Sequence, residues 1–292
     1  MGKIKILVTG ASGFIGKAFI QKIDKHAYDI FTLSHQKPVD LDRGIKGFYK
    51  QDITKPFQLD QSFDFVFHFA AYNVTHVGKA DYEVYQKINV RGTQHLLNST
   101  EIKNFIFMST AKIYKQEGKP IDETSPLEPL DDYAKTKLEA EYICRKYFTG
   151  DHLIILRSVN VVGIGQPDKA ILPVLFNQAF HNEPLDIFAP KKSFVQFLYV
   201  EDVIRTFELF MDHPNLDGIF NLSSVQKIRL DELAFKIIQL CQSKSTIHFS
   251  NLTEAPFSEI RSDKIQKKLG WVAQTPINDI LKIYHQSVNV PR

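Results

Sequence analysis

The first half of the chain alternates short apolar runs with segments of helical period. Runs of this length and composition are typical of buried strands. We expect strands at Lys5–Thr9, Asp29–Leu33, Phe48–Gln51, Phe65–Phe69, Asn104–Ser109 and Leu153–Leu156. The helical period predicts helices over Gly13–Asp24, Tyr82–Thr100 and Tyr133–Phe148. This alternation indicates βαβ units, and therefore an α/β fold with a parallel sheet covered by helices on both faces.

Three glycines follow the first strand, Ile4 to Val8, at a spacing of three residues. Gly10 permits a tight turn, Gly13 lets the backbone approach a pyrophosphate, and Gly16 lets the next helix pack close to the sheet. The N–H groups at the start of that helix then face the phosphates. The motif predicts a dinucleotide site in a Rossmann-type doubly wound sheet. Its expected contacts are Gly10, Ser12, Gly13, Phe14, Ile15 and Gly16.

The rhythm changes after about Gly163, where prolines at 167, 173, 184 and 190 separate shorter segments. We therefore expect an NAD(P)-binding domain over 1–165, to which 197–225 return. Residues 166–292 would form mainly a smaller C-terminal substrate-binding lobe. The ligand cleft is expected between the two, at the carboxyl ends of the parallel strands.

Composition adds bounds to this picture. The chain has 292 residues, of which 43% are hydrophobic, and it carries 36 basic and 33 acidic side chains. The balanced charge favours neither nucleic acid nor a membrane surface as a partner. Cys144 and Cys241 are too few for a disulfide framework and stand in no metal-ligand cluster, so we expect reduced thiols and no metal. With no signal-like or membrane-length apolar segment, a cytoplasmic protein is expected.

A tyrosine and a lysine four residues apart, Tyr133 and Lys137, share one helical face. A phenol with a pKa near ~10 is a poor acid–base catalyst at neutral pH. A nearby ammonium and an oxidised nicotinamide favour phenolate, so we expect both to lower the pKa of Tyr133. Tyr142 and Lys146 have the same spacing but point to roughly the opposite face. We choose Tyr133 because Asp131 and Asp132 mark a helix start there.

The strand that ends at Ser109 and Thr110 delivers hydroxyl groups to the carboxyl edge of the sheet. A hydroxyl there can bind the oxygen of a reacting carbonyl or alcohol while Tyr133 exchanges its proton. The alternative is that both hydroxyls only satisfy backbone groups at the strand end.

With these motifs, the chain resembles an extended short-chain dehydrogenase/reductase of the NAD-dependent epimerase/dehydratase family. The matching segments are Thr9–Gly16, Asp52-Ile53, His68–Ala71, Asn89–Thr93, Ser109–Tyr114, Tyr133–Lys137, Leu156–Asn160, Phe197–Asp202, Phe220–Ser224 and Lys268–Trp271. The resemblance implies catalytic roles for Thr110, Tyr133 and Lys137. It also implies adenine contacts from Asp52 and Ile53, a cofactor wall from Phe69, Ala70 and Ala71, and support from Asn89. Asn160 would touch a substrate that in most of this family is a sugar nucleotide, and Tyr72 and Gln196 are further substrate candidates.

Departures from the family pattern refine this interpretation. Family dehydratases have an Asp-Glu pair after the catalytic Thr, where this chain has Ala111 and Lys112, so 4,6-dehydration is not expected. The second strand ends without the acidic residue of NAD-preferring members. Ser34, His35 and Lys37 could instead donate to a 2′-phosphate, which favours NADP over NAD.

A third departure concerns the substrate. Val195 stands where sugar-nucleotide enzymes usually carry an Arg that pairs with the diphosphate. Lys191, Lys192 and Arg261 are candidates to compensate.

These patterns predict an NAD(P)-dependent enzyme that transfers hydride at a ring carbon of a nucleotide-linked sugar, as a 4-epimerase or a ketosugar reductase. Two alternatives stay open. One is an NADPH-dependent reductase or dehydrogenase of a small carbonyl or free sugar, and the other is a non-catalytic NAD(P)-binding regulator. The family resemblance also implies a homodimer formed through the helices at Tyr82–Thr100 and Tyr133–Phe148.

Overall fold

The computed structural model describes residues 2–35, 44–73, 81–150, 152–224, 226–250 and 256–288. Contacts divide the chain into two compact units. Unit 1 consists of Met1–Lys115, Ser125–Ser158 and Ile204–Asn221, and unit 2 of Gln116–Thr124, Val159–Val203 and Leu222–Arg292. The assignment of these units to cofactor and substrate remains a prediction.

A seven-stranded sheet, in the order β10-β6-β5-β4-β1-β2-β3, forms the centre of unit 1. Its strands are β1 (Ile4–Thr9), β2 (Tyr28–Ser34), β3 (Gly47–Lys50), β4 (Phe63–His68), β5 (Ile102–Thr110), β6 (Leu153–Ser158) and β10 (Gly218–Leu222). Neighbours from β3 to β6 pair in parallel. The order reverses between β1 and β4. In open α/β sheets, ligands commonly bind at the carboxyl ends of the strands beside such a switch point. The expected strands and parallel sheet are confirmed.

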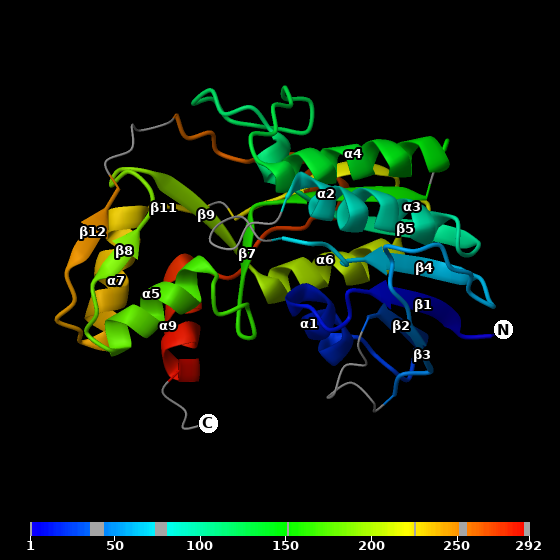
Figure 1. Ribbon diagram of the computed structural model, residues 1–292, viewed down its shortest axis with the longest axis horizontal. Helices are drawn as coiled ribbons and strands as arrows, with labels where there is room; N and C mark the ends of the chain where they lie inside the picture. Colours follow the sequence, from blue (N-terminus) through cyan, green and yellow to red (C-terminus); the bar gives the residue numbers. More distant parts are fainter. Residues whose placement is uncertain are drawn as a thin grey trace. The chain divides into compact units, whose positions relative to one another are not determined.

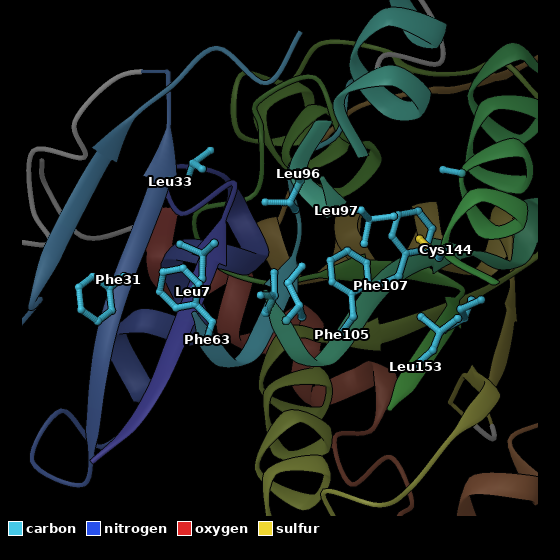
Figure 2. Close-up of a cluster of buried hydrophobic side chains, with 14 residues drawn as sticks. Leu7, Phe31, Leu33, Phe63, Leu96, Leu97, Phe105, Phe107, Cys144 and Leu153 are labelled. Carbon is cyan, nitrogen blue, oxygen red and sulfur yellow. The ribbon is translucent and has the colours of Figure 1, made fainter. Parts of the chain in front are cut away.

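Helices cover both faces of this sheet (Figure 1). They are α1 (Phe14–Lys22), α2 (Tyr82–Tyr85), the π-helical η1 (Gln86–Arg91), α3 (Gly92–Leu97), the short 3₁₀ helix η2 (Ala111–Ile113), α4 (Asp132–Tyr147) and α6 (Val200–Asp212). Figure 2 shows one face, where Leu96 and Leu97 of α3 and Cys144 of α4 pack on Phe105 and Phe107 of β5. On the other face the rings of Phe19, Phe67, Phe69 and Phe207 pack within 6.1 Å of one another, centre to centre. Full burial of the rings of Phe19, Phe67 and Phe207 stabilises the fold by about 1.5–3 kcal/mol each.

The prediction of a single α-helix over Tyr82–Thr100 is wrong in detail, because the segment changes its helical type. It is α-helical at both ends and π-helical over Gln86–Arg91, and it ends at Leu97. The wider π turn contains the buried Asn89, whose side chain bonds the backbone of Tyr72 and the hydroxyl of Thr136. These tertiary hydrogen bonds, which periodicity does not register, accompany the local change of helical pitch.

The described residues of unit 2 form two small sheets and several helices. The three-stranded sheet is β11 (Lys227–Arg229), β9 (Phe194–Tyr199) and β7 (Asn160–Val162), and the two-stranded sheet is β8 (Leu185–Ile187) and β12 (Ile247–Phe249). The helices are α5 (Ile171–Phe180), α7 (Leu230–Cys241), α8 (Asp263–Leu269) and α9 (Ile277–Val288). The buried Trp271 donates from Nε1 to the carbonyl of Asp202 at 3.1 Å.

The expected return of 197–225 to the main sheet is corrected in part. β10 joins the main sheet, but β9 pairs with β7 and β11, which satisfy its backbone groups within unit 2. Only Ile204–Asn221 of that segment belongs to unit 1. No helix of the described residues has the length and apolarity needed to cross a membrane.

Candidate active site in unit 1

The glycine turn between β1 and α1 has the expected shape. Gly10 has a φ of 67°, and a Cβ there would lie 2.6 Å from the amide nitrogen of Ala70. A Cβ at Gly16 would lie 2.3 Å from the carbonyl oxygen of Gly10, so α1 packs directly on the turn. No side chain of the described residues caps α1, whose N-cap is Gly13. The first N–H groups of α1 are thus oriented as an anion site requires.

The other residues predicted to contact a dinucleotide at the start of α1 are at least partly exposed to solvent. Ser12 is exposed, and Phe14 and Ile15 are half-buried. At the end of β2, Ser34 is buried and His35 is exposed, while Lys37 lies outside the described residues.

The loop after β3 brings a carboxylate close to the end of β2. Oδ1 of Asp52 accepts hydrogen bonds from the backbone nitrogen and hydroxyl of Thr54, at 3.0 and 2.7 Å. These bonds lower the pKa of Asp52, and His35 contributes to the same direction through its proximity. The neighbouring Ile53 packs on α3, where a Cβ at Gly92 would lie 2.9 Å from its Cδ1. The backbone bonds from Gly10 to Leu33 and from Gln51 to Ser34 place the ends of β1, β2 and β3 next to one another, and His35 and Asp52 follow β2 and β3 there.

The segment after β4 lines the turn with backbone rather than side chains. The Phe69 ring packs into the core with Phe19 and Phe207, while its backbone nitrogen donates to the Thr9 carbonyl at 3.3 Å. Ala70 donates to the Thr9 hydroxyl at 3.3 Å and abuts Gly10, and Ala71 follows it. The ring of the half-buried Tyr72 packs at 4.9 Å, edge to face, on Tyr85.

Asn89 is buried and internally bonded. Its Oδ1 accepts from the backbone nitrogen of Tyr72 at 2.7 Å, and its Nδ2 donates to the Tyr72 carbonyl and the Thr136 hydroxyl at 3.1 and 3.0 Å. Asn89 thereby fixes the segment that follows β4. The support that the family resemblance implies would be indirect, through Tyr72 and α4.

Thr110 and Tyr133 lie on elements that are joined by an ion pair. Thr110 ends β5, and its Oγ1 accepts from the backbone nitrogen of Lys112 at 3.2 Å. Lys112 Nζ lies 3.7 Å from Asp131 Oδ2, and Asp131 caps α4 by accepting from the Ala134 nitrogen at 2.7 Å. The predicted helix start is confirmed. The segment after β5 and the first turn of α4 are thus close to each other.

Tyr133 is half-buried, and the expected direction of its pKa shift is corrected. Burial raises the pKa of Tyr133 above its ordinary value, and the charge of Asp131 raises it further. Within the protein itself, desolvation of the phenolate outweighs the stabilising effect expected from Lys137. The phenol is therefore protonated at neutral pH. The second tyrosine–lysine pair of the same spacing is exposed instead: Tyr142 is 55% exposed, and Lys146 is also at the surface.

Lys137 is 2% exposed and holds its Nζ 3.9 Å from the centre of the Phe107 ring. Burial lowers its pKa to about 8, although Cys144 and Glu141 act in the opposite direction. Among the described residues its Nζ has a ring contact but no oxygen acceptor. A buried amine of this kind is a candidate to meet a ligand oxygen.

A buried hydrogen-bond network lies beside these residues, and the sequence did not predict it. The Glu141 carboxylate accepts from Ser109 Oγ, from Arg157 Nε at 3.2 Å and from Arg157 Nη2 at 2.7 Å. Arg157 Nη1 donates to the Tyr114 hydroxyl at 2.9 Å, which donates to Asn221 Oδ1 at 2.7 Å. The network joins α4 to β5, β6 and β10. An arginine directly after the apolar run of β6 was the available signal, because a buried charge requires a partner.

Two of the predicted substrate residues belong to unit 2. Asn160 is exposed at the start of β7. Gln196 is buried, and its Nε2 donates to the carbonyls of Ser224 and Ile260 at 2.9 and 3.2 Å, while its Oε1 accepts from the Ile260 nitrogen at 2.8 Å. The two amide hydrogens of Gln196 are therefore used to join the segment around Ile260 to Ser224.

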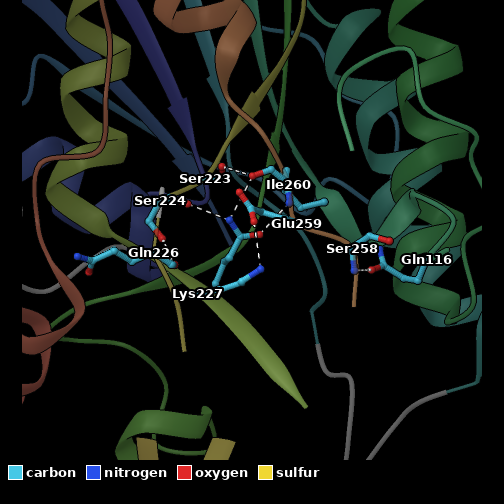
Figure 3. Close-up of polar contacts among 9 residues, drawn as sticks. Gln116, Ser223, Ser224, Gln226, Lys227, Ser258, Glu259 and Ile260 are labelled. Carbon is cyan, nitrogen blue, oxygen red and sulfur yellow. Dashed lines mark hydrogen bonds and ion pairs between the residues drawn. The ribbon is translucent and has the colours of Figure 1, made fainter. Parts of the chain in front are cut away.

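The same region contains the positions considered for a diphosphate. Val195 is half-buried and pairs with Ile228, while Lys191, Lys192 and Arg261 are exposed. Figure 3 shows the neighbouring contacts, in which Ser223 bonds the Ile260 carbonyl at 2.6 Å and Lys227 pairs with Glu259 at 3.3 Å. Lys227 is therefore already neutralised.

Comparisons with known proteins agree with this architecture. The family model described as "NAD dependent epimerase/dehydratase family" matches residues 6–223. A trifunctional UDP-glucose 4,6-dehydratase/UDP-4-keto-6-deoxy-D-glucose 3,5-epimerase/UDP-4-keto-L-rhamnose-reductase of Arabidopsis thaliana is 28% identical over 92% of the chain, which spans 45% of that protein. An uncharacterized UDP-glucose epimerase of Bacillus subtilis is 27% identical, with 85% of each chain covered.

Solved structures resemble the fold over nearly its whole length. The UDP-glucuronic acid 4-epimerase of Bacillus cereus, in complex with UDP-glucuronic acid and NAD, has a TM-score of 0.86 at 24% identity. The alignment covers 98% of this chain and 99% of that one. This likeness confirms the α/β architecture expected from the sequence.

Proposed function

Because the chain belongs to the NAD dependent epimerase/dehydratase family, we propose that it transfers hydride at a ring carbon of a nucleotide-linked sugar, as a 4-epimerase or a ketosugar reductase. One observation carries this proposal. Thr110, Tyr133 and Lys137 lie in the same compact unit as the glycine turn, at the carboxyl end of β5 and in the first turns of α4. The names of the relatives support the class of substrate.

The residues around the glycine turn fit a dinucleotide. The turn leaves no room for a Cβ at Gly10 or Gly16, and the uncapped start of α1 offers N–H donors to a pyrophosphate. Asp52 and Ile53 would hold the adenine, and the Lys137 ammonium would donate to the nicotinamide ribose. When bound, the nicotinamide supplies the hydride, or accepts it as a cation that favours phenolate at Tyr133.

The protein's own contribution is the movement of one proton. In the reductive direction, the phenol of Tyr133 donates its proton to the carbonyl oxygen as that oxygen gains negative charge. The phenol of Tyr133 is protonated at neutral pH, as this step requires. Thr110 donates a hydrogen bond to the same oxygen and fixes its position. In the oxidative direction Tyr133 takes the proton back, and the Lys137 ammonium stabilises the phenolate.

Water elimination is not part of the proposed activity. Ala111 is apolar and buried, and Lys112 is engaged with Asp131. Neither can act as the carboxyl acid or base that 4,6-dehydration uses. We therefore separate this chain from the dehydratases among its relatives.

Val195 supports a second candidate, a reductase or dehydrogenase of a small carbonyl or free sugar. Its half-buried side chain pairs with Ile228 where the family pattern has an arginine. Thermal-shift measurements with UDP, GDP, CDP and dTDP separate the two candidates. Stabilisation by one of these nucleotides supports the sugar-nucleotide enzyme, and stabilisation by none favours the small substrate.

We further propose that NADP is preferred over NAD. Ser34 and His35 stand at the end of β2, where they can donate to a 2′-phosphate. Calorimetric titration with both dinucleotides tests this preference. His35→Asp should weaken NADP binding by at least tenfold relative to NAD, because it places a carboxylate beside the phosphate. An unchanged ratio would contradict it.

A cytoplasmic homodimer completes the proposal. The helices that the family resemblance implies for the interface, α2 and α4, carry exposed apolar side chains: Tyr82, Val84, Tyr142 and Tyr147.

Mass spectrometry of the ligand retained on purified protein distinguishes a 4-epimerase from a ketosugar reductase. A dinucleotide that stays bound through turnover indicates an epimerase, and one released in its oxidised form indicates a reductase. Failure of every nucleotide sugar and simple carbonyl to react would leave a non-catalytic regulator instead.

A further inference from the structure

A buried histidine outside the proposed catalytic set connects the glycine turn to α4. His68, the last residue of β4, is 1% exposed. Its Nδ1 lies 2.6 Å from Thr9 Oγ1, in the residue before Gly10, and its Nε2 lies 2.9 Å from Thr93 Oγ1 on α3. Both ring nitrogens are therefore occupied by hydroxyl groups.

The partners of those hydroxyls determine where the ring carries its proton. Thr93 Oγ1 donates to the carbonyl of Asn89 at 2.6 Å, because a carbonyl can only accept. Thr93 must then accept from His68, so Nε2 carries the hydrogen. Burial, assisted by the charge of Lys137, lowers the pKa of His68 to about 3, so the ring is neutral and has one N–H. Nδ1 is consequently an acceptor, and Thr9 donates to it.

The chain of hydrogen bonds continues at both ends. Thr9 Oγ1 accepts from the backbone nitrogen of Ala70 at 3.3 Å. At the other end, Asn89 Nδ2 donates to Thr136 Oγ1 at 3.0 Å. The Thr136 hydroxyl shares its single hydrogen between the carbonyls of Asp132 and Tyr133, each at 3.0 Å. Thr136 lies on α4 between Tyr133 and Lys137. One buried path thus joins the backbone around Gly10 to the first turn of α4.

We propose that His68 is a positioning residue, held as the neutral Nε2–H imidazole, which aligns the catalytic turn of α4 with the dinucleotide site. The proposal rests on the proposed function for its effect on turnover. The direction of the hydrogen bonds does not depend on that function. Charging the ring would place a second cation near Lys137 and leave the acceptor role of Nδ1 unfilled.

Nuclear magnetic resonance on the intact, histidine-labelled protein tests the tautomer. Long-range proton–nitrogen correlations should show His68 protonated at Nε2 alone, unchanged from pH 5.5 to 9, with the signal assigned by its loss in His68→Gln. Protonation at Nδ1, or titration within that range, would overturn the proposal. This measurement needs no substrate, so it stands even if the proposed activity is absent.

Substitutions at Thr93 test the effect on turnover. Thr93→Val keeps the shape but can neither accept from His68 nor donate to Asn89. It should lower kcat at least tenfold while the Kd for the dinucleotide and the substrate KM stay within threefold. Thr93→Ser should restore kcat to within threefold of the unmodified enzyme. A folded Thr93→Val enzyme with unchanged kcat, or a Thr93→Ser enzyme as impaired as Thr93→Val, would contradict the positioning role.

Discussion

At the scale of single residues, two tyrosines of α4, Tyr133 and Tyr142, are each followed four residues later by a lysine, but we expect only Tyr133 to be catalytic. Tyr133 is half-buried beside the end of β5, and Tyr142 is 55% exposed. Tyr133→Phe removes the exchangeable proton, so kcat should fall by about 10²–10⁴ while dinucleotide affinity is retained. Tyr142→Phe is the matched control and should keep full activity. A steady-state assay in which both variants turn over normally would reject the role of Tyr133.

Burial of the Lys137 amine should lower the free energy of unfolding, and this effect should depend on pH. Its pKa is lowered to about 8, whereas the unfolded side chain titrates near 10.5. Below about pH 8 the Lys137 side chain is charged in both the folded and the unfolded protein. Between pH 8 and pH 10.5 the unfolded protein binds more protons than the folded protein, because the pKa of Lys137 is lowered only in the folded state. The free energy of unfolding should therefore rise with pH from about 8 to 10.5.

A substitution of Lys137 connects this cost to activity. At pH 7, Lys137→Met should stabilise the protein by about 3 kcal/mol, at ~1.4 kcal/mol for each pKa unit, and should remove the pH-dependent rise. The same variant should lose activity, because the phenolate and the ribose lose their cation. Urea denaturation at pH 7 and pH 10 measures the first effect. Equal or lower stability of the variant at pH 7 would show that the amine is not penalised by its site.

At the scale of elements, the Glu141–Arg157 pair fastens α4 to the sheet. Arg157 lies on β6 and contacts Glu141 through Nε and Nη2, with both side chains at most 3% exposed. Arg157→Met leaves a buried carboxylate without its charge partner, which typically costs about 3–5 kcal/mol. Arg229→Met removes an exposed pair with Asp231 and should cost at most about 1 kcal/mol. Chemical denaturation compares the two, and similar losses would mean that burial does not matter here.

The elements also show how far the sequence leads. Apolar runs located β1 to β6, and the glycine spacing located the turn at Gly10, because both depend on local burial and backbone geometry. The π-helical turn at Asn89 and the pairing of β9 with β7 and β11 depend on partners far along the chain. The same holds for the buried pair of Glu141 and Arg157. The pKa of Tyr133 moved opposite to expectation because desolvation depends on the whole fold rather than on one neighbour.

At the scale of the whole molecule, the proposed homodimer predicts that exposed aromatic rings on α2 and α4 are buried between the two copies. Tyr142 and Tyr147 are 55% and 44% exposed on α4, and Tyr82 is 37% exposed on α2. An interface there would bury these rings, which are enriched at protein interfaces. The double substitution Tyr142→Glu and Tyr147→Glu should therefore shift light-scattering mass from dimer to monomer, because burying two carboxylates is costly.

The control for this shift uses an aromatic side chain elsewhere in the chain. Phe235 of α7 is 55% exposed in unit 2, so Phe235→Glu should leave the mass unchanged. A protein that is monomeric before substitution would refute the dimer directly, and a dimer that survives the double substitution would require a different interface. Since α4 carries both these rings and Tyr133, a dimer through this helix would also hold the catalytic turn more firmly. The monomeric variant should then lose kcat along with mass, while dinucleotide binding persists.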